Sequence, residues 1–139
     1  MIPALEWLIP DLSKHFGINI DIDVNGEIRR FAPETELVLF RIVQESLRNV
    51  GKHAQATKAW VYIDFGKYKA TLTIKDNGRG FLLPERVGDL AALGKLGLTG
   101  MQERAQLIGG RLSIQSKPEV GTMVTVAVPN SGNLEDNEV

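Results

Sequence analysis

The order of the predicted elements indicates an α+β protein whose mixed, mostly antiparallel sheet is covered by helices on one face. Several short stretches alternate between apolar and polar residues, and most of these predicted strands follow one another as neighbouring pairs. The segments between the pairs carry apolar residues at helical spacing. Neighbouring strand pairs form hairpins, and amphipathic helices need an apolar surface to cover. A two-layer structure therefore follows.

The composition indicates one domain and excludes several kinds of function. The chain has 139 residues, with 16 Lys and Arg against 17 Asp and Glu, so no basic excess points to nucleic acid. The absence of cysteine excludes disulfides, thiolate metal sites and thiol nucleophiles. No apolar run is long enough to cross a membrane. We expect a cytoplasmic domain, which leaves open whether a parent protein is membrane-anchored.

The N-terminal part is predicted to form a helix followed by a β-hairpin. Residues 3–16 have a helical apolar stripe, and Pro10 inside it predicts a kink or two shorter helical pieces. Residues 18–24 alternate strictly, and Asn25-Gly26 predicts a tight turn. The return strand of this hairpin is expected at residues 28–31.

The longest predicted helix begins at Pro33 and runs to about Ala54. Its expected buried stripe is Leu37, Phe40, Val43 or Gln44, Leu47 and Val50. The other predicted elements are strands at 60–65 and 68–75, a helix from 96 or 97 to 108, and strands at 111–116 and 122–128. Residues 82–95 between them have no clear period, and a loop of that length predicts a lid or a binding loop.

The stretch from Asp76 to Phe81 is the first candidate binding feature. An acid at the tip of a buried strand, followed by Gly78 and Gly80, offers a fixed hydrogen-bond acceptor beside backbone that a flat ligand can approach. A nucleotide base is such a ligand. The alternative is a plain turn at the end of a strand, in which nothing binds.

A polar stripe on the longest helix is the second candidate. Glu45, Asn49 and either Lys52 or His53 share one side of this helix by their spacing. A solvated face is the simple explanation, but asparagine is a poor helix former, and its carboxamide oxygen suits Mg²⁺. Lys52 and His53 lie one turn on, where they could meet phosphates, and Glu45 could accept a proton or orient a nucleophile.

Glycines supply the remaining two candidates. Gly94, Gly97 and Gly100 surround the start of a predicted helix, where backbone amides bind phosphate, although loop punctuation would explain them equally well. Gly121-Thr122 enters the last strand with a hydroxyl that could reach Asp76 or a bridging water.

Together these four stretches resemble, in order and spacing, the asparagine box and the three glycine boxes of an ATPase superfamily. That superfamily includes gyrase, the Hsp90 chaperones, MutL and the sensor histidine kinases. Within it, QESLRNVGKHA at 44–54 and GLTGMQERA at 97–105 are similar to bacterial two-component sensor kinases related to the nitrate and redox sensors. The resemblance extends from about Glu34 to Pro129.

The resemblance implies a Bergerat-type α/β sandwich that binds ATP and Mg²⁺ between its helices and its sheet. By that match Asp76 would bind the adenine amino group, Asn49 would bind Mg²⁺, and Glu45 would assist the acceptor or its water. The further nucleotide contacts that it implies are Gly78 and Gly80 at the base and the lid hinge, Thr122 at the adenine end, and Gly97 with its neighbour Leu98 at the phosphates.

The sequence departs from the family pattern in three places. Lys95-Leu96-Gly97-Leu98 stands where many relatives have Gly-X-Gly-Leu, so the Lys95 ammonium is expected to serve the phosphate loop. Residues 101–104 read Met-Gln-Glu-Arg rather than the common Met-Arg-Glu-Arg. Neither His15 nor His53 lies in a pattern typical of the phosphoacceptor helix. Residues 1–17 are thus expected to be a linker helix from a missing dimerisation domain, 18–129 the ATP-binding catalytic domain and 130–139 a disordered tail.

The favoured function is the catalytic domain of a sensor histidine kinase, which passes the γ-phosphoryl group of Mg²⁺-ATP to a histidine on a separate dimerisation domain for relay to a response regulator. The isolated domain is expected to be a monomer and the full-length kinase a homodimer. One alternative is a serine kinase acting on an anti-sigma-factor antagonist, against which the run at 101–105 argues. Another is a nucleotide-sensing module without transfer, against which the pairing of Glu45 with Asn49 argues.

Overall fold

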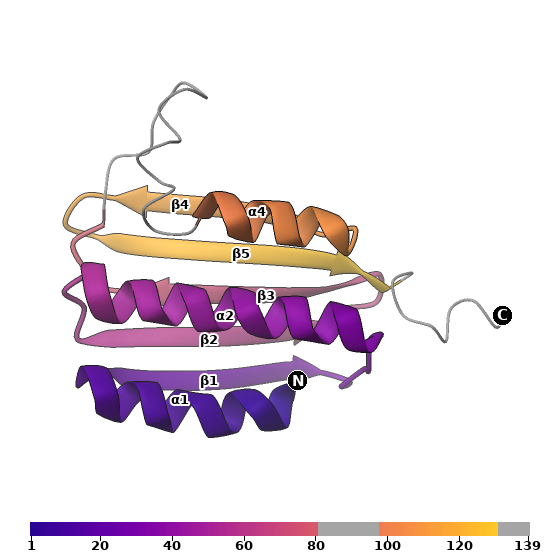
Figure 1. The fold of residues 1–139 in the computed structure, drawn as a ribbon, viewed down its shortest axis with the longest axis horizontal. Coiled ribbons are helices and arrows are strands. Elements are labelled where there is room, and N and C mark those ends of the chain that lie inside the picture. Colours follow the sequence, from indigo (N-terminus) through magenta and orange to yellow (C-terminus); the bar gives the residue numbers. More distant parts are fainter. Residues whose placement is uncertain (81–97, 131–139) are drawn as a thin grey trace, which may run out of the picture.

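The computed structural model describes residues 1–80 and 98–130, which form a five-stranded sheet and a layer of helices (Figure 1). The elements in chain order are α1 (Ile2–Phe16), β1 (Asn19–Gly26), α2 (Pro33–His53), β2 (Lys58–Phe65), β3 (Lys69–Asp76), α4 (Leu98–Leu107), β4 (Arg111–Lys117) and β5 (Gly121–Pro129). The predicted lid at 82–95 and the tail at 131–139 lie outside the described residues.

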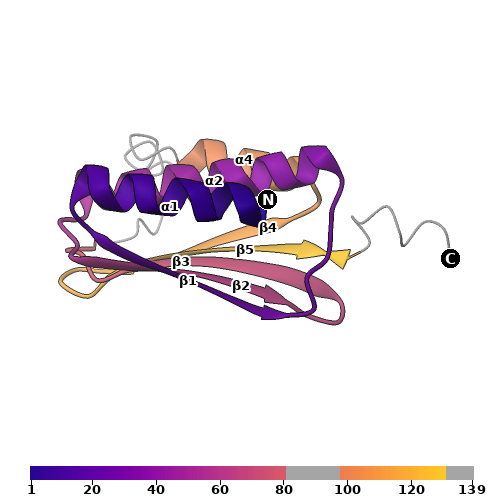
Figure 2. The same ribbon diagram turned by 90° about the horizontal axis from the view of Figure 1, so that it is seen from below.

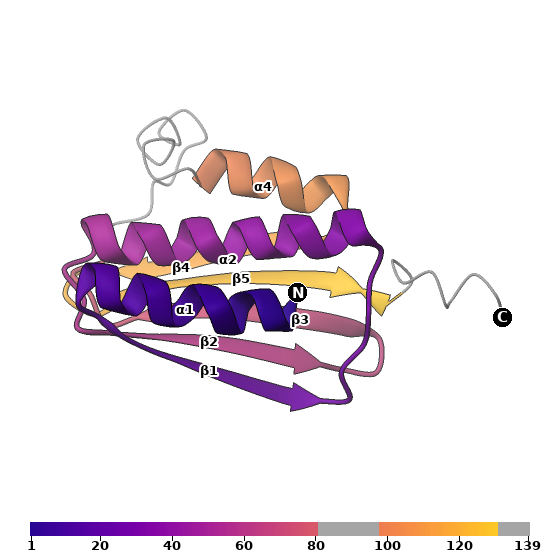
Figure 3. The ribbon, with the colours of Figure 1, turned by 60° about the horizontal axis from the view of Figure 1, so that its bottom comes forward.

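The sheet has the strand order β1-β2-β3-β5-β4, and only its first pair is parallel. α1, α2 and α4 cover the same face of the sheet, as Figure 2 shows. α2 lies between the other two helices in this layer (Figure 3). The prediction of a two-layer α+β fold with a mixed, mostly antiparallel sheet is therefore confirmed.

The core lies between the two layers and follows from the alternation along the central strands. Three residues of β2 and three of β3 point from the sheet toward the helices, and all are buried: Ala59, Val61, Ile63, Ala70, Leu72 and Ile74. From α2, the buried apolar residues are Leu39, Ile42, Val43, Leu47 and Val50. One of the predicted stripe positions is wrong, because Leu37 is 55% exposed. Phe40 is half-buried and packs against the core. The buried face of α2 instead passes through Leu39 and Ile42.

The predicted hairpin at Asn25-Gly26 is wrong. β1 runs parallel to β2 in a register that pairs Gly26 with Phe65, and residues 28–31 form no strand. Gly26 has φ of 87°, and a Cβ there would lie 3.1 Å from the Phe65 carbonyl carbon. The glycine thus allows close approach to the neighbouring strand instead of a tight turn. Parallel strands need a crossover connection, which α2 provides.

Glu36 holds the connection between β1 and α2. Its carboxylate accepts hydrogen bonds from the Phe31 N–H at 3.0 Å and from Arg30 Nε at 3.2 Å, and it lies 3.3 Å from the Met1 nitrogen. Burial acts to raise the pKa of Glu36, while the hydrogen bond from the Phe31 N–H and the charge of Arg30 act to lower it. The contacts with Phe31 and Arg30 fix the segment between β1 and α2.

α1 is one continuous helix from Ile2 to Phe16, so the alternative of two shorter pieces at Pro10 is wrong. The proline ring is exposed, whereas Leu8, Ile9 and Leu12 around it are buried. Packing of that apolar face keeps the helix continuous although proline cannot donate a backbone hydrogen bond.

Asn130, which the sequence analysis assigns to the C-terminal tail, is buried at the end of β5. Its Nδ2 donates hydrogen bonds to the Lys67 carbonyl at 2.6 Å and to the Gly66 carbonyl at 3.2 Å. Its N–H bonds to the Tyr68 carbonyl at 2.8 Å. Asn130 thus closes the turn between β2 and β3. Among the described residues, no helix is long and apolar enough to cross a membrane.

Candidate functional site

Asp76 is the last residue of β3, the central strand of the sheet, and it is 5% exposed. Its Oδ1 accepts a hydrogen bond of 2.8 Å from the Gly78 N–H, and the Thr122 N–H donates a second bond to the carboxylate. Burial raises the pKa of Asp76, while the two N–H donors act to lower it. The result is a carboxylate whose position is fixed by backbone on both sides.

The turn after Asp76 is fastened to the end of α2 and the start of β2. Asn77 Oδ1 accepts hydrogen bonds of 3.0 Å from the Thr57 and Lys58 N–H groups, and its Nδ2 donates to Thr57 Oγ1 at 2.9 Å. The Arg79 N–H donates to the Ala54 carbonyl at 2.7 Å. Asp76 is thereby held beside the C-terminal end of α2.

The two glycines of this turn are required by packing. Gly78 is buried, and a Cβ there would lie 2.6 Å from the Ala54 Cβ. Gly80 has φ of 59°, and a Cβ there would lie 2.8 Å from the Lys117 carbonyl carbon. The sequence pattern predicts that a ligand approaches these glycines, whereas in this structure the chain itself occupies the space at both positions.

The turn from β4 to β5 completes the surroundings of Asp76. Gly121 has φ of 129°, and a Cβ there would lie 3.0 Å from the Asp76 carbonyl carbon. The Thr122 hydroxyl was expected to reach Asp76 or a bridging water, but the bond to Asp76 comes from the Thr122 N–H. The hydroxyl instead lies 2.9 Å from Ser116 Oγ. Thr122 therefore lies beside Asp76, and its backbone makes the contact.

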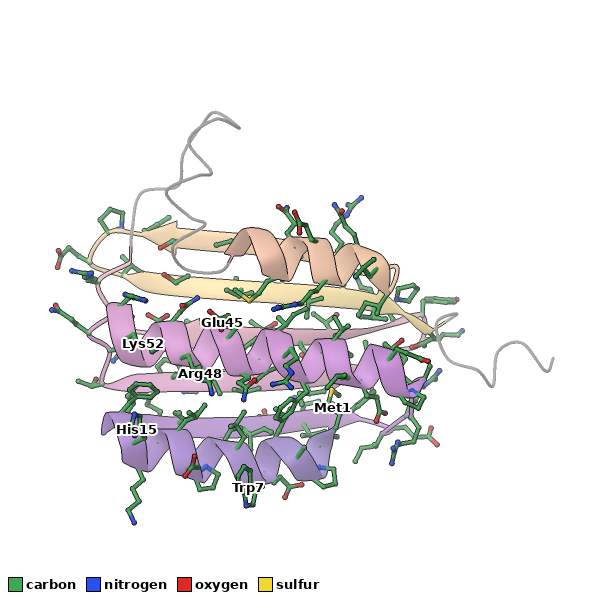
Figure 4. All side chains as sticks on the ribbon, in the orientation of Figure 1. Met1, Trp7, His15, Glu45, Arg48 and Lys52 are labelled. Carbon is green, nitrogen blue, oxygen red and sulfur yellow. The ribbon has the colours of Figure 1, made fainter. Side chains whose placement is uncertain are left out.

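The polar stripe of α2 lies on the flank toward α4. Glu45 and Asn49 are half-buried and lie one turn apart, and Figure 4 shows Glu45 on the edge of α2 nearest α4. On the neighbouring stripe, Ser46 Oγ is 3.5 Å from Met101 Sδ of α4. Lys52 and His53 are exposed in the last turn of the helix. The helix end that carries them is the one fastened to the Asp76 turn.

The site offers oxygen ligands for a metal ion and a hydrogen-bond acceptor for a nucleotide. Asn49 supplies a carboxamide oxygen that suits Mg²⁺, and Glu45 supplies a carboxylate one turn earlier on the same helix. Asp76 supplies a buried acceptor suited to an amino group. Within residues 1–80 and 98–130, no group of three or more His, Asp or Glu side chains is arranged to hold a metal ion. Lys95 and Gly97 lie outside the described residues, and Leu98 is placed only as the first residue of α4.

Asn77 is the residue at this site that the sequence analysis missed as an anchor. Its side chain binds backbone some twenty positions earlier in the chain. A local pattern such as Asp-Asn-Gly reads as a turn and contains no signal of that distant contact.

Comparison with known proteins establishes the family. Residues 34–132 match the histidine kinase-, DNA gyrase B- and HSP90-like ATPase family, and the chain belongs to that family. It is 40% identical over 129 residues to the signal transduction histidine-protein kinase/phosphatase DegS of Brevibacillus brevis, covering 93% of this chain and 32% of the relative. It is 38% identical over 126 residues to the oxygen sensor histidine kinase NreB of Staphylococcus carnosus, covering 91% and 35% respectively.

The fold is shared with a solved histidine kinase. The histidine kinase domain of a blue-light activated histidine kinase from Erythrobacter litoralis superposes with a TM-score of 0.71 at 23% identity, over 91% of this chain and 59% of that domain. The chain spans about a third of the length of the curated relatives that it matches. It is therefore an ATP-binding catalytic domain of the type that sensor histidine kinases contain.

The anchoring of the Asp76 turn can be tested at Asn77. We expect Asn77→Ala to lower the free energy of unfolding by about 1 kcal/mol, because two N–H groups lose their acceptor at a site that water reaches. Urea unfolding measures this. Asn77→Asp keeps the oxygen acceptor and is the matched control, expected to remain closer to the original stability. Equal losses in both variants would show that the accepted bonds are not the source of the effect.

Proposed function

We propose that this domain transfers the γ-phosphoryl group of Mg²⁺-ATP to a histidine on a separate dimerisation and phosphoacceptor domain, from which it passes to an aspartate of a response regulator. The observation that carries the proposal is the fixed Asp76 carboxylate, whose turn is fastened to the C-terminal end of α2, the helix that carries Glu45 and Asn49. The relatives named as histidine kinases support it.

In this proposal the base and the phosphates contact different elements. Asp76 accepts a hydrogen bond from the adenine amino group, and Thr122 helps through the N–H that holds the carboxylate. Gly78 and Gly80 shape the turn on which the base rests. Lys52 and His53 are exposed at the end of α2 and meet the phosphates. Leu98, the first residue of α4, is assigned to the phosphates as well, and so are Lys95 and Gly97, which lie outside the described residues.

The metal and the acceptor belong to the polar flank of α2. Asn49 would hold Mg²⁺, which neutralises phosphate charge when bound. Glu45, one turn earlier, would orient the acceptor or take its proton. Phosphoryl transfer of this kind depends mainly on positioning and charge neutralisation, which a few fixed polar groups can supply. We place the domain in the cytoplasm, because both ATP and a response regulator are found there, and we expect a monomer that belongs to a homodimeric kinase.

Asp76 determines base recognition in this proposal. We expect Asp76→Asn to weaken ATP binding by about 1.5–3 kcal/mol, the contribution of a hydrogen bond to a charged group. The variant should also discriminate less between ATP and GTP, because an amide can turn to match either base. Calorimetric titration with both nucleotides measures this. Unchanged ATP affinity would contradict the adenine role.

The raised pKa of Asp76 adds a pH dependence to ATP binding. Protonation removes the charge of the acceptor, so the ATP affinity should fall on acidification, starting at a higher pH than for an exposed aspartate. Asp76→Asn is the control, because it lacks this titration. Protonation of ATP itself affects both proteins equally, so the difference between their pH profiles reports on Asp76. Equal pH profiles for the two proteins would exclude titration of Asp76 as the cause.

Substitutions of the two polar residues on α2 should affect different steps, ATP binding for one and phosphoryl transfer for the other. Asn49→Ala should abolish the part of ATP affinity that depends on Mg²⁺, whereas Glu45→Gln should leave affinity nearly intact and slow the transfer. Titrations with Mg²⁺ and with EDTA measure the first effect, and transfer to an added acceptor domain measures the second. Equal losses of affinity in both variants would mean that these roles are wrongly divided.

The decisive experiment is transfer between separate proteins. The chain should bind ATP without labelling itself, because His53 lies on the same rigid helix as Asn49 and His15 lies at the end of α1. Neither can easily reach the in-line position that transfer requires. With labelled ATP and a dimerisation domain from its parent kinase, that partner should gain acid-labile phosphate. Acid-stable phosphoserine would favour a serine kinase, and stable self-labelling on His53 or His15 would contradict the proposal.

A further inference from the structure

Gly51 lies inside α2, near its C-terminal end, where glycine lowers helix stability relative to alanine. A glycine in such a position has a packing reason when another group occupies the space of its side chain. Here the occupant is the Phe16 ring, because a Cβ on Gly51 would lie 2.6 Å from Phe16 Cδ1 and still closer to Cγ. These are atoms near the root of the ring, so rotation of a flexible tip cannot relieve the overlap.

Phe16 is held in this position from its own side. It is the last residue of α1, and Gly17 ends the helix with φ of 68°. The Ser13 carbonyl accepts a bond of 3.1 Å from the Ile18 N–H, and the Ser13 hydroxyl bonds to the Ile18 carbonyl. The His15 ring meets Phe16 edge to face at 4.7 Å. The end of α1 therefore presents the Phe16 ring to α2 in a defined place.

The contact lies in the part of α2 that the proposed function uses. Asn49 precedes Gly51 by two residues and Lys52 follows it directly. By helical spacing Gly51 and Asn49 point to different flanks, one toward α1 and the other toward α4. Figure 4 shows His15 of α1 and Lys52 of α2 at the same end of the helix layer. A shift of α2 at Gly51 must therefore move Asn49 as well, because an α-helix is rigid over one turn.

We propose that Phe16 is a positioning residue, whose ring in the Gly51 seat sets where the last turns of α2 place Asn49. The inference rests on the proposed role of Asn49 in holding Mg²⁺. It makes α1 part of the nucleotide site although none of the residues proposed to bind the nucleotide belongs to α1. A displacement of α1 would then alter metal-dependent ATP binding through one side-chain contact.

Helix propensity predicts the direction in which Gly51→Ala would change stability if nothing occupied the space beside Gly51. Alanine is the better helix former, so Gly51→Ala should stabilise the chain if the space were free. With Phe16 present we expect a lower unfolding midpoint, because the added methyl group displaces the ring or the helix. In a Phe16→Ala background the overlap is gone, and the same Gly51→Ala change should raise the unfolding midpoint.

The functional measurement is the magnesium increment, defined as the ratio of the ATP Kd in EDTA to the ATP Kd in Mg²⁺. We expect Gly51→Ala to lower this increment by about tenfold, within the range for residues in direct contact. In the Phe16→Ala background the same substitution should change it by less than about twofold. Leu37→Ala, at an exposed position of the same helix, is the control and should leave the increment unchanged.

The outcomes separate this inference from the proposed function. If Gly51→Ala lowers the unfolding midpoint but leaves the magnesium increment intact, the contact is structural only and the inference is wrong. The same holds if the loss is equally large with and without Phe16. Asn49→Ala in the same titrations tests the metal role itself. If Asn49→Ala keeps the full increment, the metal assignment fails and this inference fails with it. If Asn49→Ala loses the increment and Gly51→Ala keeps it, only this inference fails and the proposed function stands.

Discussion

The buried carboxylate of Asp76 is the constraint on which the surrounding structure depends. An ionised carboxylate loses its water when it is buried, so it must receive hydrogen bonds from fixed donors. The Gly78 and Thr122 N–H groups are these donors, and they come from two turns that are far apart in the chain. Both turns must therefore meet at the end of β3, and their glycines allow this close approach.

The same turn fixes the helix layer relative to the sheet. Asn77 and Arg79 bind backbone at the start of β2 and at the end of α2, so the last turn of α2 cannot move independently of Asp76. α2 in turn lies between α1 and α4 (Figure 3). Its flank toward α4 carries Glu45 and Asn49, while Gly51 receives Phe16 from α1. One helix thus connects the candidate metal ligand with the first helix of the chain.

The folded unit is larger than the region that matches the family. The match begins at residue 34, which leaves α1 and β1 outside it. Yet β1 pairs with β2 along its whole length, and α1 buries Leu5, Leu8, Ile9 and Leu12 in the common core. Removal of this first part would expose the edge of β2 and one flank of α2. α1 and β1 therefore share one sheet and one core with the matched region in this structure.

The sequence by itself determined the fold class, the family and nearly every element, because strand alternation, helical spacing and the four motif stretches are local patterns. It placed the Asp76 turn and the polar flank of α2, and the structure brings both to the same end of the molecule. It did not reveal that β1 pairs in parallel with β2, since Asn25-Gly26 has the composition of a hairpin turn while its actual partner, Phe65, is distant in sequence. Nor did it reveal the role of Asn77, the backbone contact of Thr122 or the seat for Phe16 at Gly51. Each of these depends on atoms that only tertiary packing brings together, so the physical reason for the residue lies in a neighbour that is not adjacent in the chain.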